Sequence, residues 1–241
     1  MFYSIQGEGS HTGKPAVFLR LQGCNLTCGG NNTIKTKRID SDAAWRCDTI
    51  EVWTKGQNQS FESILNQWQH QKWIRHLKNG AHLILTGGEP LMWQDQFILF
   101  IQFFQKKLGF KPYIECETNA TLLPENTFLN VIDQFNVSPK LANSGMSKAK
   151  RIKRDVLRFF SQQSKAHFKF VVAKKADCEE LEQDFIQPFS IPLARIQLMP
   201  AADSRESCLS LSEQVVEWAK DIGVGFSTRL HLLLWNKKTG V

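Results

Sequence analysis

The feature that most constrains the fold is the alternation, along the whole chain, of short apolar segments with segments of helical spacing. Apolar runs bounded by turn residues predict strands, and apolar residues three or four positions apart predict helices. The predicted strands are residues 16–21, 82–85, 113–116, 131–137, 167–172, 195–198 and 226–234. The predicted helices are residues 61–77, 94–108, 150–161, 179–185 and 212–222. Such β/α units predict an α/β fold whose parallel sheet curls into a partial barrel.

The number of domains follows from the same pattern. A length of 241 residues allows one large domain or two small ones. We find no internal repeat and no low-complexity linker, so a single domain over residues 1–241 is predicted. The apolar run at 232–235 is far too short to span a membrane, and the first nine residues do not resemble a signal peptide. A cytoplasmic protein without a membrane partner is therefore expected.

The positive charge is concentrated in one segment. The formal net charge is +7. Residues 148–158 contribute much of it, because six basic residues stand there against Asp155: Lys148, Lys150, Arg151, Lys153, Arg154 and Arg158. Such a run is typical of a solvated helix face, although an anionic ligand or RNA is an alternative.

The cysteines fall into two groups. Cys116, Cys178 and Cys208 lie in or beside apolar segments and are expected to be buried. The others, Cys24, Cys28 and Cys47, share one polar loop after the first predicted strand, with an insertion at about residues 24–49. Three thiolates suit a four-iron cluster whose fourth iron stays open. No fourth cysteine or histidine lies nearby at zinc-ligand spacing. Another metal, or unligated thiols, are the alternatives.

A second motif, Thr86-Gly87-Gly88-Glu89-Pro90, follows the next predicted strand. Ligands of parallel sheets bind at the carboxyl ends of the strands. Paired glycines let the backbone pass close to a ligand, and Glu89 adds a hydrogen-bond acceptor. A tight strand-to-helix connection would explain the glycines equally well.

Together, the cysteine loop and the Gly-Gly-Glu-Pro motif resemble the radical S-adenosylmethionine superfamily, and within it the 7-carboxy-7-deazaguanine synthase family. Further matching stretches are residues 2–9, 18–24, 47–49, 117–119, 137–141, 198–200 and 229–241. The resemblance implies a radical enzyme that converts 6-carboxy-5,6,7,8-tetrahydropterin to 7-carboxy-7-deazaguanine with loss of ammonia, a step toward queuosine. It also implies a 4Fe–4S cluster, S-adenosylmethionine and Mg²⁺ as cofactors.

The resemblance assigns roles to residues by their motif positions. Substrate contacts are implied for Ile5, Gln6, Gly7, Arg20, Thr86, His231 and Val241. S-adenosylmethionine contacts are implied for Gly88, Glu89, Glu117, Ser138, Pro139, Lys140, Leu198, Met199, Pro200 and Ala201. The cluster would be held by Cys24, Cys28 and Cys47, and the magnesium ion by Thr49. A flavodoxin or ferredoxin as electron donor and a homodimer are implied as partners, and no nucleic acid is expected.

Four of these residues could have a purely structural role instead. Arg20 could be a structural ion-pair partner, Thr49 a helix cap, His231 a core histidine and Lys140 an exposed lysine. Two departures from the usual patterns are also present. Eighteen residues separate Cys28 from Cys47, and Ala120 follows Glu117-Thr118-Asn119 where the family usually has glycine.

Two other functions compete with the synthase. One is a different radical enzyme, such as an activase that installs a glycyl radical on a partner protein. The other is a metal-stabilised RNA-binding protein that uses the basic run. The Gln6-Gly7-Glu8 turn, Arg20 and the Cys47-Asp48-Thr49 stretch favour the carboxylated pterin over both.

Overall fold

One sheet organises the chain. The computed structural model describes residues 1–40, 42–238 and 240. It contains eight strands whose spatial order equals their order in the sequence. The strands are β1 (Phe2–Ile5), β2 (Pro15–Arg20), β3 (His82–Thr86), β4 (Ile114–Thr118), β5 (Gln134–Val137), β6 (Ala166–Val172), β7 (Ile196–Pro200) and β8 (Gly225–Phe226). Neighbours from β2 to β8 run parallel, and β1 alone pairs antiparallel, with β2.

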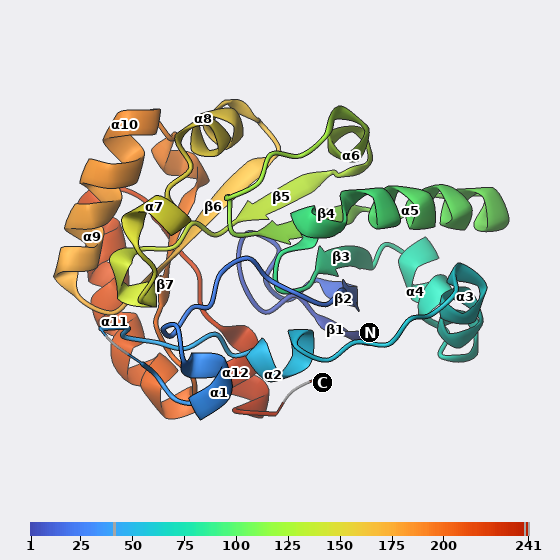
Figure 1. Ribbon diagram of the computed structural model, residues 1–241, viewed down its shortest axis with the longest axis horizontal. Helices are drawn as coiled ribbons and strands as arrows, with labels where there is room; N and C mark the ends of the chain where they lie inside the picture. Colours follow the sequence, from blue (N-terminus) through green and yellow to red (C-terminus); the bar gives the residue numbers. More distant parts are fainter. Residues whose placement is uncertain (41, 239, 241) are drawn as a thin grey trace.

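The helices lie around the outside of the curved sheet (Figure 1). The α-helices are α1 (Thr33–Thr36), α2 (Ile50–Trp53), α3 (Phe61–His70), α4 (Trp73–Lys78), α5 (Gln94–Leu108), α6 (Asn126–Val131), α7 (Lys148–Arg151), α8 (Arg154–Gln162), α9 (Lys175–Leu181), α10 (Gln187–Phe189), α11 (Arg205–Ile222) and α12 (Leu230–Trp235). Short 3₁₀ segments are η1 (Pro90–Trp93), η2 (Ala142–Ser144) and η4 (Leu193–Arg195), and η3 (Glu182–Ile186) is a π-helical turn. None of the helices in the described ranges has the length and apolar character that crossing a membrane requires.

The sheet does not close on itself. Within the described residues β1 pairs only with β2, and β8 pairs only with β7. The predicted α/β fold, a partial TIM-like barrel of parallel β/α units, is therefore confirmed. Since all strands from β2 onward run parallel, their carboxyl ends and the loops that follow them meet at one end of the barrel.

Some predicted elements differ from the structure. The predicted helix at 61–77 is two helices, because Lys72 adopts a left-handed conformation with a φ of 63° between α3 and α4. The predicted helix at 150–161 is also divided, between α7 and α8. The strand predicted at 131–137 begins only at Gln134, since Val131 is the last residue of α6 and two residues connect the helix to β5. β1 was not among the predicted strands.

The strand predicted at 226–234 is wrong. β8 is only two residues long, and residues 230–235 form the helix α12. A short apolar run such as Leu232-Leu233-Leu234 suits a buried helix as well as a strand, because periodicity cannot separate the two at this length.

The outer face of the sheet is the hydrophobic core. Phe135 of β5 is fully buried and packs against Phe128 of α6 and Phe160 of α8, with ring centroids 6.3 and 5.4 Å away. Phe168 and Phe170 of β6 are equally buried. Burying one such side chain stabilises the fold by roughly 1.5–3 kcal/mol. Phenylalanine packing thus holds the helices on the sheet.

The inner face of the same strands is polar. Successive residues of a strand point to opposite faces, so the neighbours of these phenylalanines face the barrel interior. Glu115 and Glu117 of β4, Asn136 of β5 and Lys169 of β6 contact one another there through hydrogen bonds and ion pairs. Buried polar groups need such partners, so the interior is a network rather than a second hydrophobic core.

Candidate functional site

The two predicted motifs pack directly on each other at the carboxyl ends of β2 and β3. The backbone N–H of Glu89 donates to the carbonyl of Gly23, at 3.0 Å. A Cβ atom on Gly88 would lie 2.3 Å from Cβ of Cys24, and one on Gly87 would lie 2.7 Å from the carbonyl oxygen of Leu21. Both glycines are therefore required by close backbone approach. These contacts are made to the start of the cysteine loop, and the predicted contact of Gly88 with S-adenosylmethionine stays a prediction.

The insertion between Cys28 and Cys47 folds back on the loop. The N–H of Cys47 donates to the carbonyl of Cys28 at 3.1 Å, and the N–H of Ala44 donates to the carbonyl of Asn143 at 2.7 Å. The indole N–H of Trp45 donates to the side chain of Asn143 at 2.9 Å. These contacts anchor the insertion on η2 and bring the third cysteine beside the first two.

The three cysteines suit an iron-sulfur cluster by their donors and surroundings. They share a small apolar cluster with Leu26 and Met146. Burial raises the pKa of Cys24 to about 11 and that of Cys28 to about 12, so both thiols are protonated at neutral pH and must lose their protons to bind a metal. The ammonium of Lys140 counteracts both shifts and favours the thiolates.

Three cysteines of one loop suit a cluster with several irons. Among the described residues, one set of three His, Cys, Asp or Glu side chains converges closely enough for one metal ion, and it contains no cysteine. In a cluster with several irons, each thiolate binds a different iron. As predicted, the other three cysteines, Cys116, Cys178 and Cys208, are buried.

Glu89 has a structural use in this arrangement. Its side chain is fully buried and accepts hydrogen bonds from the N–H of Leu91, the hydroxyl of Thr118 and the N–H of Asn119, at 3.0, 2.8 and 2.7 Å. Burial raises its pKa to about 7. The carboxyl group thus joins η1 to the end of β4, and its predicted contact with S-adenosylmethionine stays a prediction.

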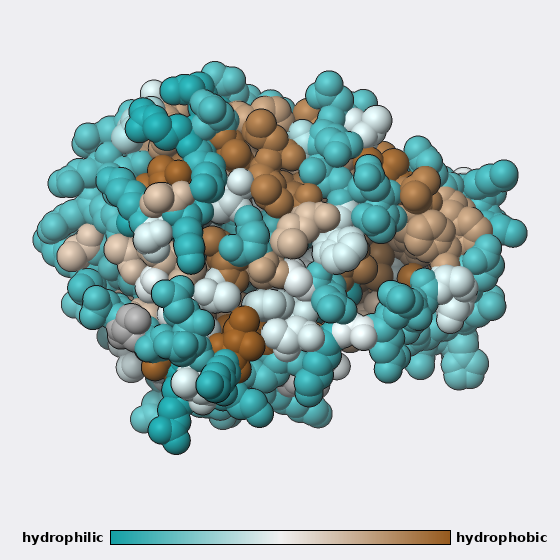
Figure 2. All heavy atoms as spheres, in the orientation of Figure 1, coloured by the Kyte–Doolittle hydropathy of each residue, from teal (hydrophilic) through white to brown (hydrophobic). Residues whose placement is uncertain are grey.

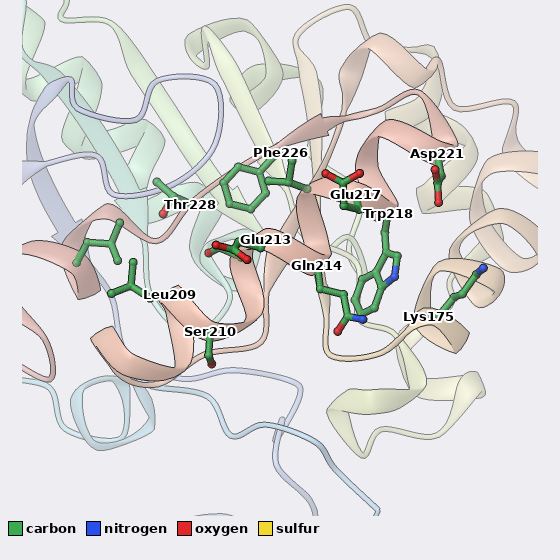
Figure 3. A pocket seen from close by; sticks show the side chains of 13 residues that line it. Lys175, Leu209, Ser210, Glu213, Gln214, Glu217, Trp218, Asp221, Phe226 and Thr228 are labelled. Carbon is green, nitrogen blue, oxygen red and sulfur yellow. The ribbon is translucent and has the colours of Figure 1, made fainter.

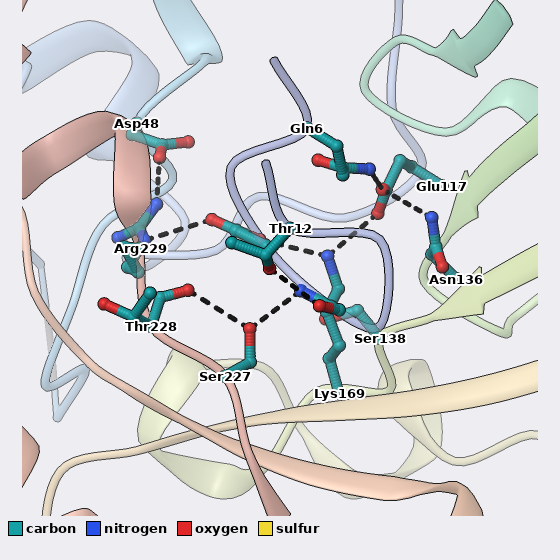
Figure 4. Close-up of polar contacts among 12 residues, drawn as sticks. Gln6, Thr12, Asp48, Glu117, Asn136, Ser138, Lys169, Ser227, Thr228 and Arg229 are labelled. Atoms are coloured by element: carbon teal, nitrogen blue, oxygen red, sulfur yellow. Dashed lines mark hydrogen bonds and ion pairs between the residues drawn. The ribbon is translucent and has the colours of Figure 1, made fainter. Parts of the chain in front are cut away.

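Gln6 and Glu117, predicted to contact different ligands, are hydrogen-bonded to each other. The Gln6 side-chain amide donates to Oε1 of Glu117 at 2.9 Å, and the amide of Asn136 donates to the same oxygen at 2.9 Å. Figure 4 shows these side chains pointing toward one another from the first turn, β4 and β5. The predicted substrate turn therefore meets the inner face of the sheet.

Ion pairs extend this network across the barrel interior. Lys169 of β6 lies 3.0 Å from both Glu8 and Glu117, and Arg229 lies 3.1 Å from Glu8 and also pairs with Asp48 (Figure 4). Burial alone would raise the pKa of Glu8, but Lys169 and Arg229 hold it well below its usual range. Burial would likewise lower the pKa of Lys169, yet Glu117 and Glu8 raise it above its usual value.

The sequence analysis did not assign site roles to Lys169, Asn136, Arg229, Glu8 or Asp48. A signal was present for two of them, because Lys169 and Asn136 are polar residues at alternate positions of otherwise apolar strands. Nothing local indicated the pairing of Glu8 with Lys169, since 161 positions separate the two residues.

Arg20 lies at the carboxyl end of β2, next to Thr86 of β3 in register. Its guanidinium donates to the carbonyl of Gly87 at 2.5 Å, and its Nε is buried without a hydrogen-bond partner in the described part of the chain. Burial lowers its pKa, while Asp48, Cys47 and Glu117 oppose that shift. Arg20 makes no ion pair within 4 Å among the described residues, so the structural ion-pair reading does not hold.

Thr49 stands at the N-cap position of α2, but its side chain makes no capping hydrogen bond. Its hydroxyl lies instead 3.4 Å from the sulfur of Cys47. The capping role considered above is therefore wrong, and the hydroxyl faces the cysteine loop.

The first turn meets the helix α12. The N–H of Leu230 donates to the carbonyl of Gly7 at 2.8 Å. A Cβ on Gly7 would lie 2.3 Å from Nδ1 of His231, so only glycine lets the ring approach this closely. Burial lowers the pKa of His231, which favours the neutral imidazole. Ile5 is half-buried at the end of β1, and Val241 lies outside the described residues.

The other predicted S-adenosylmethionine residues follow β5 or lie in and directly after β7. The Lys140 ammonium donates to the hydroxyl of Ser138 at 3.0 Å and lies 5.7 Å from the ring centre of Trp45, so it is not simply exposed. Pro139, Met199 and Pro200 are buried, and Ala201 begins the loop after β7. The side chain of Leu198 belongs to the hydrophobic core, so its backbone alone is available to a ligand.

The basic run is only partly a solvated face. Arg151 is 4% exposed, with its guanidinium 2.6 Å from Glu180, and Lys148 pairs with Asp184.

Figure 2 shows hydrophilic residues along the rim of one face of the molecule and more hydrophobic residues toward the centre of that face.

A groove lies beside α11 and β8. It measures about 870 Å³ and is lined by residues that include Glu213, Gln214, Trp218 and Phe226 (Figure 3). None of its lining residues was predicted to bind a ligand. The chemistry is therefore expected at the carboxyl ends of the strands and not in this groove.

Known proteins identify the class of this fold and site. A family model described as a 4Fe-4S single cluster domain matches residues 5–158. The 7-carboxy-7-deazaguanine synthase of Pyrobaculum aerophilum is 32% identical over 100% of this chain and 95% of its own length. The synthase of Halobacterium salinarum is 28% identical, over 98% of this chain and 89% of its own. The crystal structure of QueE from Escherichia coli shares the fold with a TM-score of 0.60 at 23% identity, covering 96% of this chain and 92% of that one.

The chain is thus an iron-sulfur protein of the radical S-adenosylmethionine class. It belongs to the 7-carboxy-7-deazaguanine synthase family. Membership confirms the predicted enzyme class and two of the predicted cofactors, the 4Fe–4S cluster and S-adenosylmethionine.

Proposed function

We propose that this chain binds 6-carboxy-5,6,7,8-tetrahydropterin in the barrel interior and converts it to 7-carboxy-7-deazaguanine with loss of ammonia. The observation that carries the proposal is Arg20, a half-buried cation at the strand ends whose buried Nε has no partner among the described residues. Buried donors are normally satisfied, and a guanidinium pairs best with a carboxylate. Arg20 thus supports recognition of the carboxyl group of the pterin.

The protein would hold its cofactors at the loops that follow the strands. Cys24, Cys28 and Cys47 would hold the cluster, and the Gly88 backbone with the loops after β5 and β7 would hold S-adenosylmethionine. When bound, this pair supplies the 5′-deoxyadenosyl radical that starts the reaction. The chain's own residues position the substrate and exclude water around it.

The Gln6-Gly7 turn, His231 and the ion pairs of Lys169 would together orient the pterin. The Gln6-Gly7 turn is fixed by the hydrogen bond from Gln6 to Glu117 and by the contact of Gly7 with His231. The neutral imidazole of His231 closes the turn without adding a charge. We propose that Lys169, which pairs with both Glu8 and Glu117, keeps these carboxylates oriented toward the bound ring.

We further propose that Thr49 helps to hold a magnesium ion together with the substrate carboxylate. Its hydroxyl is not used for capping, and Asp48 beside it is half of an ion pair at the same edge. Hydroxyl and carboxylate oxygens are the hard ligands that Mg²⁺ prefers. A homodimer, a flavodoxin or ferredoxin as electron donor, and a cytoplasmic location complete the proposal, since free thiols persist best in a reducing compartment.

Product analysis tests the function. The protein is reconstituted anaerobically with iron and sulfide and incubated with the pterin, S-adenosylmethionine, Mg²⁺ and a reductant. We expect 7-carboxy-7-deazaguanine by mass spectrometry, and we expect the Arg20→Ala variant to lose its formation. The same variant should keep its iron content and its slow cleavage of S-adenosylmethionine without substrate. Full product formation by Arg20→Ala would remove Arg20 from the site.

The magnesium proposal is tested separately with Thr49→Ala and the hydroxyl-keeping control Thr49→Ser. The rate of Thr49→Ala should respond less to Mg²⁺, while Thr49→Ser should respond as the wild type does. An unchanged magnesium dependence in Thr49→Ala would exclude the hydroxyl as a ligand.

A further inference from the structure

The opposite end of the barrel carries a group of side chains that the proposed reaction does not use. His11 lies in the turn between β1 and β2, His82 begins β3, and Glu115 is the second residue of β4. Nδ1 of His11 lies 2.9 Å from Oε1 of Glu115, and Nδ1 of His82 lies 2.6 Å from the same oxygen. Two imidazoles and one carboxylate therefore converge on a single point.

The distances suit a metal ion after small side-chain movements. The three ligand atoms all lie within 4.8 Å of one another. Two histidines and one glutamate form a known zinc-ligand set, with bonds of about 2.0–2.2 Å and a fourth position open to water. A set of two imidazoles and one carboxylate suits a divalent transition metal.

The surroundings orient the ligands as metal sites require. Glu115 is 0% exposed, and its other oxygen accepts from the amide of Asn136 at 2.6 Å, which leaves Oε1 to face the histidines. The amide of Gln134 in turn donates to the side-chain oxygen of Asn136 at 2.8 Å. The ring of His82 lies against Tyr113, with centroids 4.4 Å apart. Supporting contacts of this kind are typical of the outer shell of metal sites.

The geometry also provides a route for the ion. The side chain of His11 is 29% exposed, whereas those of His82 and Glu115 are 9% and 0% exposed. An ion would therefore enter beside His11 and meet the two buried ligands behind it. Since His82 and Thr86 are the two ends of β3, about 13 Å of strand separates this site from the substrate end.

We propose that His11, His82 and Glu115 bind a divalent transition-metal ion of the zinc type at the amino ends of the strands. The ion fastens the turn that carries His11 to β3 and β4. The same turn begins with Gln6, Gly7 and Glu8, so a metal bound here steadies the substrate-facing residues from behind. The site exists independently of the proposed reaction.

Zinc uptake by the cluster-loaded protein tests the site, because loaded cysteines cannot supply ligands to added zinc. We expect one zinc per chain by elemental analysis after incubation and gel filtration. X-ray absorption at the zinc edge should show nitrogen and oxygen neighbours at about 2.0–2.1 Å and no sulfur at about 2.3 Å. Zinc with sulfur neighbours would overturn the proposal, since it would place the ion on the cysteine loop.

Variants identify the ligands. His11→Ala changes a half-buried turn residue and should lower zinc affinity at least tenfold with an unchanged circular dichroism spectrum. His82→Ala should do the same and serves as the second ligand variant. His70→Ala removes an exposed histidine at the end of α3 and should leave zinc binding unchanged. Wild-type affinity in His11→Ala, or no zinc in the wild type, would leave a hydrogen-bonded cluster and overturn the metal site.

Discussion

The two faces of the same sheet are stabilised in opposite ways. On the outer face Phe135, Phe168 and Phe170 are buried under the helices, and their attraction has no preferred direction. On the inner face Asn136 and Lys169, their immediate neighbours in sequence, each depend on particular partners. Packing volume therefore decides which substitutions the outer face accepts, while the inner face accepts only residues that keep its hydrogen bonds and charges.

This difference separates stability from function. The outer face holds the barrel together but touches none of the predicted ligands. The inner face positions Gln6, Glu8 and Glu117 around the proposed substrate space, at the cost of burying charges. Substitutions on each face should thus give different combinations of lost stability and lost activity.

The largest loss of stability is expected from Phe135→Ala on the outer face. Removing a fully buried ring leaves a cavity, and such changes cost about 3–5 kcal/mol of unfolding free energy. Urea denaturation of the cluster-free protein measures it. Leu99→Ala is the control, because Leu99 of α5 is 56% exposed and should lose less than about 0.5 kcal/mol. A loss below 1 kcal/mol for Phe135→Ala would contradict the role of the outer face.

Lys169→Met should disrupt the ion pairs of the inner face. The change leaves Glu8 and Glu117 without their shared cation, and breaking one partner from a buried ion pair costs about 3–5 kcal/mol. Because Arg229 still pairs with Glu8, the loss of unfolding free energy should lie near the lower end of this range. Unlike Phe135→Ala, the variant should lose product formation even at temperatures where it stays folded. Lys220→Met, at an exposed pair with Glu217, should change neither property.

Glu8→Gln should give a smaller loss that depends on pH. The ion pairs hold the pKa of Glu8 below its usual 4.5, so the ionised form stabilises the folded state. That contribution is complete above pH 4.5 and is lost as the pH falls further and the carboxylate takes up a proton. The variant should lose about 2 kcal/mol at pH 7 and progressively less below pH 4.5, measured by urea denaturation. An equal loss at pH 7 and at the lowest pH where both proteins stay folded would contradict this assignment.

The smallest effect is expected from Ala120→Gly, and it should be stabilising. Ala120 has a φ of 60°, a left-handed conformation that costs a residue with Cβ about 1–2 kcal/mol. Glycine removes this strain, although its freer unfolded chain offsets about 0.4–1 kcal/mol. A net gain of about 0.5–1 kcal/mol is expected in urea denaturation. Ala219→Gly, within α11, should instead destabilise the protein by about 1 kcal/mol.

The strain at Ala120 explains one departure noticed in the sequence. The turn after β4 requires a left-handed residue, a conformation that glycine adopts at less cost than alanine. The N–H groups of Asn119, Ala120 and Thr121 donate to the side chains of Glu89, Thr118 and Asn119, and these bonds hold the turn around the alanine.

The sequence was most informative where local pattern determines structure. The strands around Ile84 and Cys116 and the helix α5 were predicted because their apolar residues are dense and regularly spaced. α12 was mistaken for a strand because it contains too few residues to reveal a helical period.

The inner network could not be predicted for a different reason. Strands are predicted from the average hydrophobicity of a segment. This average does not single out one polar residue within the segment, such as Lys169 or Asn136. Their partners lie far away in sequence, and only the curvature of the sheet brings Glu8 to Lys169. The motif residues were found because their chemistry is concentrated in short stretches.

The way the insertion is anchored has a consequence for recognising related chains. Cys47 reaches the other two cysteines through contacts with the Cys28 carbonyl and with η2, and not through a short connection. The number of residues between the second and third cysteines is therefore free to vary, as long as the returning segment keeps those contacts. A search that demands a fixed cysteine spacing would overlook proteins built this way, whereas a search for the anchoring contacts would retain them.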